Sequence, residues 1–450
     1  HCQGVGDAAL SRSSPQGEEL GKDLPTAETQ FSMSAPTGLE PSASGETIRN
    51  VRRELTIFLV VTAAMGMTFG IFETTFNNYL NDTFAITAEA RGKLEFPREL
   101  PGFLVTLMGG VLFFLSETRL GVLSALGIAA GIVGLAFTGD DYGRMIAFMV
   151  IWSMGNHLLM PVTGTIALSL APRNKRAAKM GQIGAVGMAA TIVGAGVVWA
   201  GMQYIDIGYR GIFLVAAGGA TLAAISIGFI KPLPKREGRR PKLVLKRRYG
   251  LYYLLNVFSG ARKQIFMTFG VWVLIKVFEQ PAYTIAKLWI VASALGIVFQ
   301  PQLGKLIDRL GERAILMANA IIIIIICLGY GFAHLLPIAH PVWVVYVCYV
   351  IDNLIFATGI ARATYLDKIA EQESDIHASL SVGVTIDHAI SMSIPALGGI
   401  LWVSHGYPWV FVAAAAIAVL DLTAAGFIRV PRGHVEGPVP TATEMMDAPP

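Results

Sequence analysis

The chain has 450 residues, of which 54% are hydrophobic and only 15% are charged. Soluble proteins carry roughly 25% charged residues, so this composition excludes an assembly of soluble domains. The net charge of +4 is small and the apolar residues stand in long runs, which argues against nucleic-acid binding. Because these runs are far longer than the roughly 10-residue alternating strands of a membrane barrel, the sequence predicts an all-α membrane protein.

Two polar tails flank the apolar part of the chain. Residues 1–50 and 431–450 are rich in Ser, Pro, Gly, Thr and Glu and contain no long apolar run. Such segments cannot bury enough apolar surface to fold, so we expect two disordered cytoplasmic tails. The first tail also lacks the basic start and apolar centre of a secretory signal peptide.

Between the tails, hydropathy predicts twelve membrane-spanning helices. A spanning helix needs about 20 mostly apolar residues, and residues 211–230 supply such a run without a charge. Isolated charges interrupt several of the other runs. The approximate spans are residues 54–80, 97–116, 119–138, 143–171, 177–204, 210–230, 250–276, 284–306, 313–333, 340–367, 377–404 and 408–429.

A basic segment, residues 231–248, divides these spans six and six. Lys- and Arg-rich loops stay on the cytoplasmic side, so both termini are expected there, while Arg91, Lys93 and Arg98 are assigned to the outer side. Binding of anionic lipid or of a partner is the alternative role of the basic segment. The expected organisation is an N-terminal six-helix bundle at 51–230, a basic cytoplasmic linker at 231–250 and a C-terminal six-helix bundle at 251–430.

The two halves share local patterns. The segment between the eighth and ninth spans reads Gly304-x-x-x-Asp308-Arg309-x-Gly311-x-Arg313, and residues 110–119 occupy the equivalent place in the first half. The segments before the fifth and eleventh spans correspond in the same way. Internal repeats of this kind are typical of transporters, because they allow two alternative packings of the halves.

The Gly304 motif is similar to the cytoplasmic loop motif of the major facilitator superfamily, and the six-plus-six layout resembles that family over residues 50–430. The resemblance implies two pseudo-symmetric bundles and a cytoplasmic gate. The first-half copy has Phe114 where the family has Asp. It therefore lacks this part of the gate, unless Glu117 and Arg119 take over the role. The gate residues implied are Gly304, Asp308, Arg309, Gly311, Arg313, Glu117 and Arg119.

Polar residues inside the predicted spans are the candidate site. A charge at bilayer depth costs at least a few kcal/mol and tends to face a cavity or a partner. The candidates for substrate binding or ion coupling are Glu73, Asn77, Asn156, His157, Arg262, Lys263, Asp352, Asp387 and His388. In the resembled family the first, fourth, seventh and tenth spans line the central cavity, which places most of these residues there. A buried structural ion pair or hydrogen bond is the alternative for each.

Two details refine this set. Arg262 and Lys263 are about 100° apart on a helix, so we expect only one of them to face a solute. Residues 95–102 contain Glu95, Arg98 and Glu99 at helical spacing, near the expected outer edge. They suit either an outer gate charge cluster or a solvated helix start with Pro in its first turn.

These patterns predict a secondary active transporter that works by alternating access. The chain has no phosphate-binding Gly-x-x-x-x-Gly-Lys-Ser/Thr loop, so we expect an ion gradient rather than ATP to drive it. Proton coupling is expected, with Glu73, Asp352 or Asp387 as carrier. Arg262 and Lys263 favour a small anionic solute. We expect no cofactor, no metal site and no nucleic-acid partner, in a multi-pass protein of a bacterial-type inner membrane.

Other classes stay open. A transporter-like sensor or partner-binding membrane protein has the same fold. A drug efflux antiporter is less favoured, because the fourth span lacks an intramembrane Arg and the fifth lacks the Pro of the antiporter motif. A membrane-embedded enzyme would need converging catalytic groups, and His334, His340 and His405 form no recognisable metal or catalytic spacing.

Overall fold

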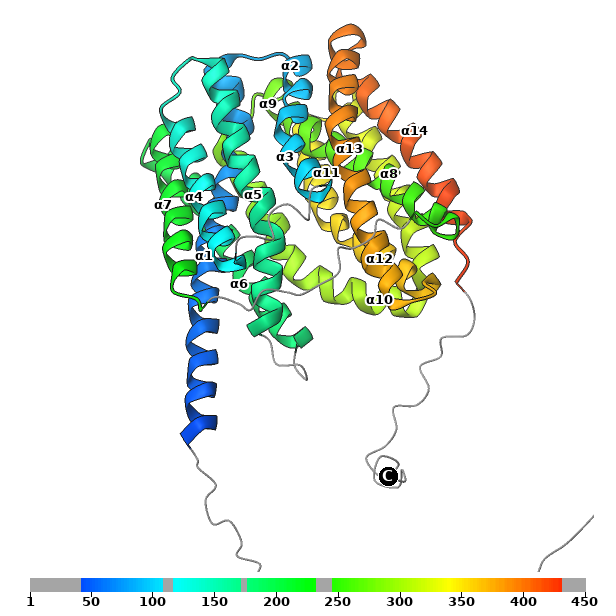
Figure 1. Cartoon of the computed structure of the whole chain (residues 1–450). Helices are drawn as coiled ribbons and strands as arrows, with labels where there is room; N and C mark the ends of the chain where they lie inside the picture. The colour runs from blue at the N-terminus through cyan, green and yellow to red at the C-terminus, as the bar shows by residue number, and fades with distance from the viewer. Residues whose placement is uncertain (1–41, 108–115, 171–175, 232–244, 431–450) are drawn as a thin grey trace, which may run out of the picture. The chain divides into compact units, whose positions relative to one another are not determined.

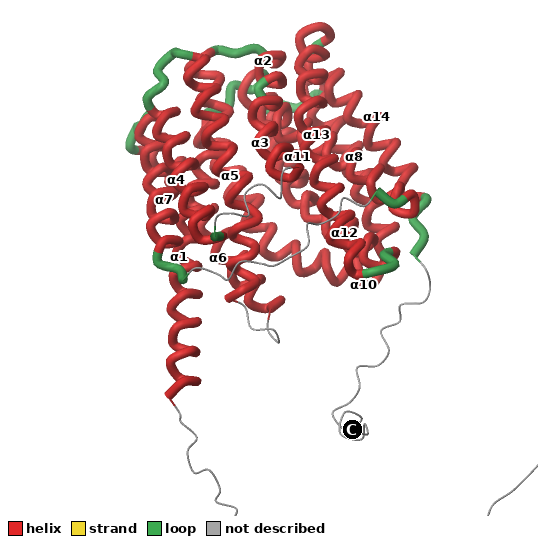
Figure 2. The backbone as a smooth tube through the Cα atoms, in the orientation of Figure 1, coloured by secondary structure: helices red, strands yellow, loops and turns green. Residues whose placement is uncertain are grey.

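The computed structural model describes residues 42–107, 116–170, 176–231 and 245–430. All regular structure in these ranges is helical, and they contain no strand (Figure 2). The all-α prediction is confirmed. The helices from Arg49 onward belong to one compact unit.

The N-terminal half, defined as the described residues before the basic segment, contains seven helices. Thr87 caps the short α2, since its hydroxyl oxygen accepts a hydrogen bond from the Ala90 amide. Helix α4 packs between α5 and α7, and an added Cβ at Gly155 would approach within 2.6 Å of the Ser124 carbonyl, so the backbones are in close contact. The helices are α1 (Ser42–Phe84), α2 (Ala88–Lys93), α3 (Glu95–Leu107), α4 (Glu117–Ala136), α5 (Tyr142–Leu170), α6 (Arg176–Tyr204) and α7 (Tyr209–Gly228).

The C-terminal half, defined as the described residues from 245 onward, is more irregular. A π-helical turn, η3, interrupts its first membrane-depth helix, and such turns are frequent at functional sites. Gly311 breaks the long α10 with a φ of 79°, a conformation that favours glycine. The elements are η2 (Arg247–Tyr249), α8 (Gly250–Ile265), η3 (Phe266–Gly270), α9 (Val271–Lys276), α10 (Ala282–Phe332), η4 (Ala333–Leu335), α11 (Val342–Ile355), η5 (Phe356–Thr358), α12 (Gly359–Ile369), α13 (Glu373–His405) and α14 (Tyr407–Gly426).

The largest contacts between the halves are those of α2 and α3 with α13 and of α6 with α10. Figure 1 shows α2 and α9 at the end of the helices opposite the end of α14. The backbones come close there, because an added Cβ at Gly399 would lie 2.6 Å from the Ala88 carbonyl oxygen. At this end the halves meet through α2, α3 and α13, in addition to the contact between α6 and α10.

Nine described helical segments are long and apolar enough to cross a membrane. The second predicted span is missing from this set because α3 has only 13 described residues. The seventh is missing because it is divided into α8, η3 and α9. The eighth and ninth predicted spans run together as Ala282–Leu335, whose 54 residues far exceed the about 20 that one crossing needs. The membrane prediction is confirmed, and the count of twelve stays a prediction.

Candidate functional site

The contact between α2, α3 and α13 contains buried charge. Arg91, Glu95, Arg98 and Glu99 lie on one face of α2 and α3, because their spacings of three and four residues match the helical repeat. Glu95 is 0% exposed and Arg91 is 4% exposed. A solvated helix start is therefore wrong for this segment, because Arg91 and Glu95 are buried. The assignment of Arg91 and Arg98 to the outer side of the membrane stays a prediction. We call these four residues, together with Gln264, His157 and His388, the central network.

Ion pairs alternate in sign along the central network. Arg91 Nη1 lies 2.5 Å from Glu95 Oε1, and Arg98 Nη2 lies 2.6 Å from Glu95 Oε2. The same guanidinium is 2.6 Å from Glu99 Oε1. Arg91 Nε donates to Asn77 Oδ1 at 2.8 Å, which holds this predicted site residue against α2. Burying charges is costly unless each is paired and hydrogen-bonded, and these pairs meet that condition.

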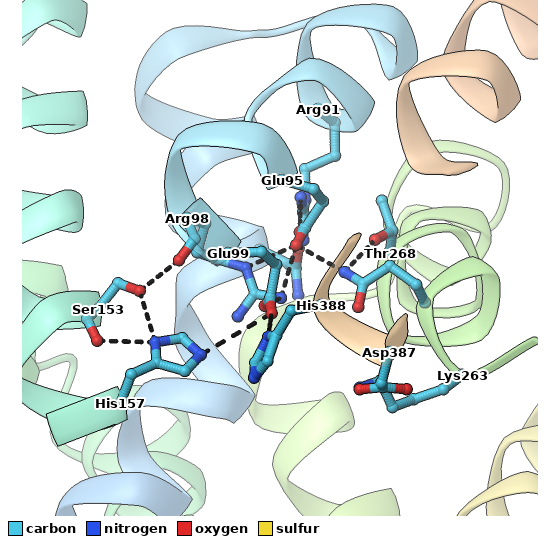
Figure 3. A network of polar contacts seen from close by, with 12 residues as sticks. Arg91, Glu95, Arg98, Glu99, Ser153, His157, Lys263, Thr268, Asp387 and His388 are labelled. Carbon is cyan, nitrogen blue, oxygen red and sulfur yellow. Dashed lines mark hydrogen bonds and ion pairs between the residues drawn. The ribbon is translucent and has the colours of Figure 1, made fainter. Parts of the chain in front are cut away.

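Two hydrogen bonds of the central network cross between the halves. Gln264 Nε2 donates to Glu95 Oε2 at 2.6 Å and lies 3.3 Å from Thr268 Oγ1, which belongs to η3. His388 Nδ1 lies 3.0 Å from Glu99 Oε2. Figure 3 shows both contacts between α3 and the helices of the C-terminal half. Through Thr268, the π-helical turn η3 therefore contacts the central network.

The predicted residue His157 faces this carboxylate from α5. Its Nδ1 donates to the Ser153 carbonyl oxygen at 2.9 Å, and its Nε2 is 3.8 Å from Glu99 Oε2. The rings of His157 and His388 are 5.0 Å apart and cross at 71°. Gly102 permits this approach, since a Cβ there would lie 2.6 Å from the His388 ring.

The remaining predicted cations pair within the C-terminal half. Arg262 on α8 forms an ion pair with Asp352 on α11, and Lys263 forms one with Asp387 on α13. The two neighbours thus point to different helices, as their angular separation requires. Whether either faces a solute stays a prediction.

Glu73 lines a small pocket whose enclosed space is that of about one water molecule. Phe72 and Trp152 form one wall, with ring centroids 3.9 Å apart. Glu73 takes part in no hydrogen bond or ion pair with any described residue, whereas Asp352 and Asp387 are paired. The full lining is Phe72, Glu73, Phe76, Asn77, Arg91, Arg98, Trp152 and Met267. Asn156 on α5 is half-buried and is not part of this lining.

The predicted gate residues lie apart from the central network. Gly304 is helical, Gly311 forms the break in α10, and Asp308, Arg309 and Arg313 are exposed around it. Glu117 and Arg119 begin α4, whose cap is Ser116. Residues 110 and 114 of the first-half copy lie outside the described ranges. A gating role for these residues stays a prediction.

An ion pair between a buried glutamate and a partly exposed lysine, missing from the sequence prediction, stands beside this motif. Glu312 is 2% exposed and its Oε1 lies 2.6 Å from Lys368 Nζ on α12. Glu312 follows the break at Gly311 directly, and an acid in a first helical turn is favoured by the helix dipole. Its position after Gly was the available signal. For the central network the sequence gave part of the answer. The helical spacing of Glu95, Arg98 and Glu99 was visible in it, but the residues with which they pair were not.

The fold and the site define a polytopic α-helical membrane protein whose two halves meet at a buried ionic network. The sequence profile of the Major Facilitator Superfamily matches residues 58–385, and the chain belongs to this family. It is therefore an integral membrane protein of a transporter family. A search of curated proteins found no match.

Solved transporter structures share the fold. The nucleoside transporter NupG superposes with a TM-score of 0.68 at 13% identity, over 83% of this chain and 98% of that one. A bacterial homologue of the human lysosomal transporter Spinster, in its inward-facing and occupied conformation, gives a TM-score of 0.61 at 16% identity, over 82% of this chain and 95% of that one. At these identities the likeness shows the fold alone.

Proposed function

We propose that this protein is a proton-coupled secondary transporter of a small solute, in which six-helix bundles at 51–230 and 251–430 alternate about the central network. The observation that carries the proposal is the buried ion-paired cluster of Arg91, Glu95, Arg98 and Glu99 at the contact between the halves. Charges in a membrane protein are costly and mark transport pathways. Structural contacts between membrane helices use mainly small residues and uncharged polar ones, and charged residues are rare in them.

The links between the halves suit a contact that opens and closes. Besides the bonds from Gln264 and His388, Asn78 Nδ2 donates to the Gln280 carbonyl at 2.9 Å. Such polar groups exchange a protein partner for water at a net cost of only about 1 kcal/mol each. With both termini in the cytoplasm, as the basic segment indicates, the structure corresponds to a state closed on the outer side.

Glu73 is the proposed proton-exchange group. It lines the pocket and can take up a proton without first breaking an ion pair, unlike Asp352 and Asp387. Protonation removes one negative charge from the pocket and weakens the attraction between Glu73 on α1 and Arg98 on α3, both of which belong to the N-terminal half. The charged and titratable groups that face Glu73 are Arg91, Glu95, Arg98, Glu99 and Tyr349.

The chemistry of the pocket lining suits a small polar solute that contains a ring. Its lining combines an aromatic wall with a carboxylate, an amide and two guanidinium groups, and aromatic side chains stack on planar rings. Arg262 and Lys263 are each paired with an aspartate, which weakens the earlier argument for an anionic solute. Nucleosides are a suitable first panel, since the similar structure NupG is a nucleoside transporter.

The test is uptake into proteoliposomes that hold the purified protein. With an imposed pH gradient, we expect uphill accumulation of a panel solute, and Glu73→Gln should retain solute counterflow but lose the response to the gradient. Glu279→Gln, at an exposed carboxylate, is the matched control and should transport like wild type. Undiminished gradient-driven accumulation by Glu73→Gln would overturn the role of Glu73 in proton exchange. Absence of counterflow for every solute of the panel would overturn the proposal that the protein transports solutes of this class.

A further inference from the structure

Two imidazoles and one carboxylate converge between the halves. Glu99 lies on α3, His157 on α5 and His388 on α13, and Figure 3 shows both rings directed at the Glu99 carboxylate. One ligand atom from each of the three lies within 4.8 Å of the other two. We propose that these residues form a binding site for a divalent transition metal ion, of which Zn²⁺ is the model case, and that the bound ion clamps the two halves together.

The donor atoms are oriented by contacts outside the set. The hydrogen bond from His157 Nδ1 to the Ser153 carbonyl fixes the tautomer in which the lone pair of Nε2 faces Glu99. Arg98 holds Glu99 Oε1 at 2.6 Å, so Oε2 is the oxygen that faces the imidazoles. Metal-binding histidines and carboxylates are positioned by outer contacts of this kind.

The spacing is close to that of a coordination shell. Zinc binds nitrogen and oxygen at about 2.0–2.2 Å, which places the ligand atoms of a tetrahedron about 3.4 Å apart. Glu99 Oε2 is 3.0 Å from His388 Nδ1 and 3.8 Å from His157 Nε2, values on either side of that spacing. In the bound form the His388 proton moves from Nδ1 to Nε2, and the metal takes the place of the hydrogen bond to Glu99.

The charge around the site favours a cation. The two guanidinium groups of Arg91 and Arg98 are outnumbered by the carboxylates of Glu73, Glu95 and Glu99, all of which lie around the same pocket and network. Lys263 is neutralised by Asp387. Imidazole and carboxylate ligands suit first-row transition metals better than Mg²⁺ or Ca²⁺. Three protein ligands leave a fourth position for water or for a donor atom of a solute.

The clamp follows from where the ligands reside. Glu99 and His157 belong to the N-terminal half and His388 to the C-terminal half, so an ion that binds all three stabilises the state in which the halves touch. A ligand shifts an equilibrium only by its different affinity for the two states, and here the affinity depends on contact between the halves. Metal binding is measurable without transport; only the expected slowing of solute exchange rests on the proposed function.

Binding is tested with Co²⁺ on the purified full chain after removal of any polyhistidine tag. We expect one visible d–d absorption band that saturates at one equivalent and is displaced by Zn²⁺. His157→Gln and His388→Gln should each weaken Co²⁺ binding at least tenfold. His405→Gln is the matched control, since His405 lies exposed on the same helix as His388, and should bind like wild type. Absence of saturable binding, or binding unchanged in both His157→Gln and His388→Gln, would overturn the site.

Two further measurements separate folding and transport from binding. The unfolding temperature without metal shows whether a variant is folded, and Glu99→Gln serves as a second variant if a histidine change prevents folding. Addition of Zn²⁺ should slow solute counterflow at least fivefold in wild type and leave His388→Gln unaffected. Saturable Co²⁺ binding with unchanged counterflow would refute the clamp alone. Binding with no counterflow for any solute would instead count against the proposed function and leave the metal site standing.

Discussion

Replacing Glu95 by Gln tests the energetics of the central network most directly. The Glu95 carboxylate is 0% exposed and accepts hydrogen bonds from Arg91, Arg98 and Gln264 at distances of 2.5, 2.7 and 2.6 Å. Gln preserves the size of the side chain but removes its charge and turns one acceptor atom into a donor. Both guanidinium groups then lose the carboxylate that they share.

The expected cost follows from burial. Breaking a buried ion pair by removal of one partner costs about 3–5 kcal/mol, because the other charge is left uncompensated. Glu95 has two such partners, so we expect the upper end of that range for Glu95→Gln. Since native proteins are stable by about 5–15 kcal/mol, this loss should bring the protein close to its limit of folding.

Helix α2 offers a matched control in Glu89→Gln. Glu89 Oε1 and Lys93 Nζ are 2.6 Å apart at the same four-residue spacing, but the side chains are 37% and 60% exposed. An exposed pair of this kind contributes roughly 0–1 kcal/mol. The two variants thus apply one chemical change at two depths, and only the buried one should matter.

The measurement is the free energy of unfolding in mixed micelles, followed by tryptophan fluorescence. Arg91→Met, alone and combined with Glu95→Gln, completes a double-mutant cycle whose coupling energy belongs to the Arg91–Glu95 pair. Equal losses for Glu95→Gln and Glu89→Gln would refute the burial argument. So would a coupling energy within the roughly 0.3–0.5 kcal/mol expected of independent sites.

Three further predictions concern backbone and pH. Gly311→Ala should cost about 1–3 kcal/mol, because φ is 79° there, while Gly304→Ala, in open helical surroundings, should not lower the unfolding temperature. Gly102→Ala should cost about 1–3 kcal/mol by overpacking against the two histidine rings, which the same unfolding measurement detects. Outside the spans, a hydrogen bond from Lys246, and then one from a tyrosine hydroxyl, lower the pKa of Asp375 below its ordinary value. A carboxyl with a lowered folded pKa stabilises the protein above its unfolded pKa of about 3.9, and that stability is lost as pH falls through the folded pKa. The unfolding temperature of wild type should therefore fall more steeply than that of Asp375→Asn as the pH is lowered from 6 to 3, and equal slopes would contradict the assignment.

Hydropathy was sufficient for most of the fold because the membrane dictates it. Apolar runs such as those of α4 and α7 are long enough to span and carry few charges, so their bounds were predicted to within a few residues. The start of the second span was also predicted to within two residues, at 97 against Glu95 in the structure, but the burial of the charges around it was not predicted. Helices α2 and α3 are rich in charge, and a hydropathy scale assigns charged residues to water even when other helices supply their counter-ions.

The site was predictable only in part, since pairing is a property of tertiary structure. Glu73, His157 and His388 were identified because a polar residue in an apolar run is costly wherever it points. The bonds from Glu99 to His388 and from Glu95 to Gln264 join segments far apart in the chain, and no periodicity connects them. The spacing on α3 was visible, but whether it faced water or protein depended on α13.

If the halves alternate as proposed, the position of the network suits an interface that has to move. Apolar packing within each half is strong and does not need to change. If the contact between the halves were equally apolar, separating them would expose that surface to a water-filled cavity at about 25 cal/mol for each Å². Polar groups such as Gln264 and Asn78 lose a protein partner and gain water instead, at a far smaller net cost. The ion pairs of Arg91 and Arg98 with Glu95 and Glu99 stay within α2 and α3, so they remain intact when the halves part. In the proposed transition the charges would move as one neutralised unit, while the bonds from Gln264, His388 and Asn78 to the other half break.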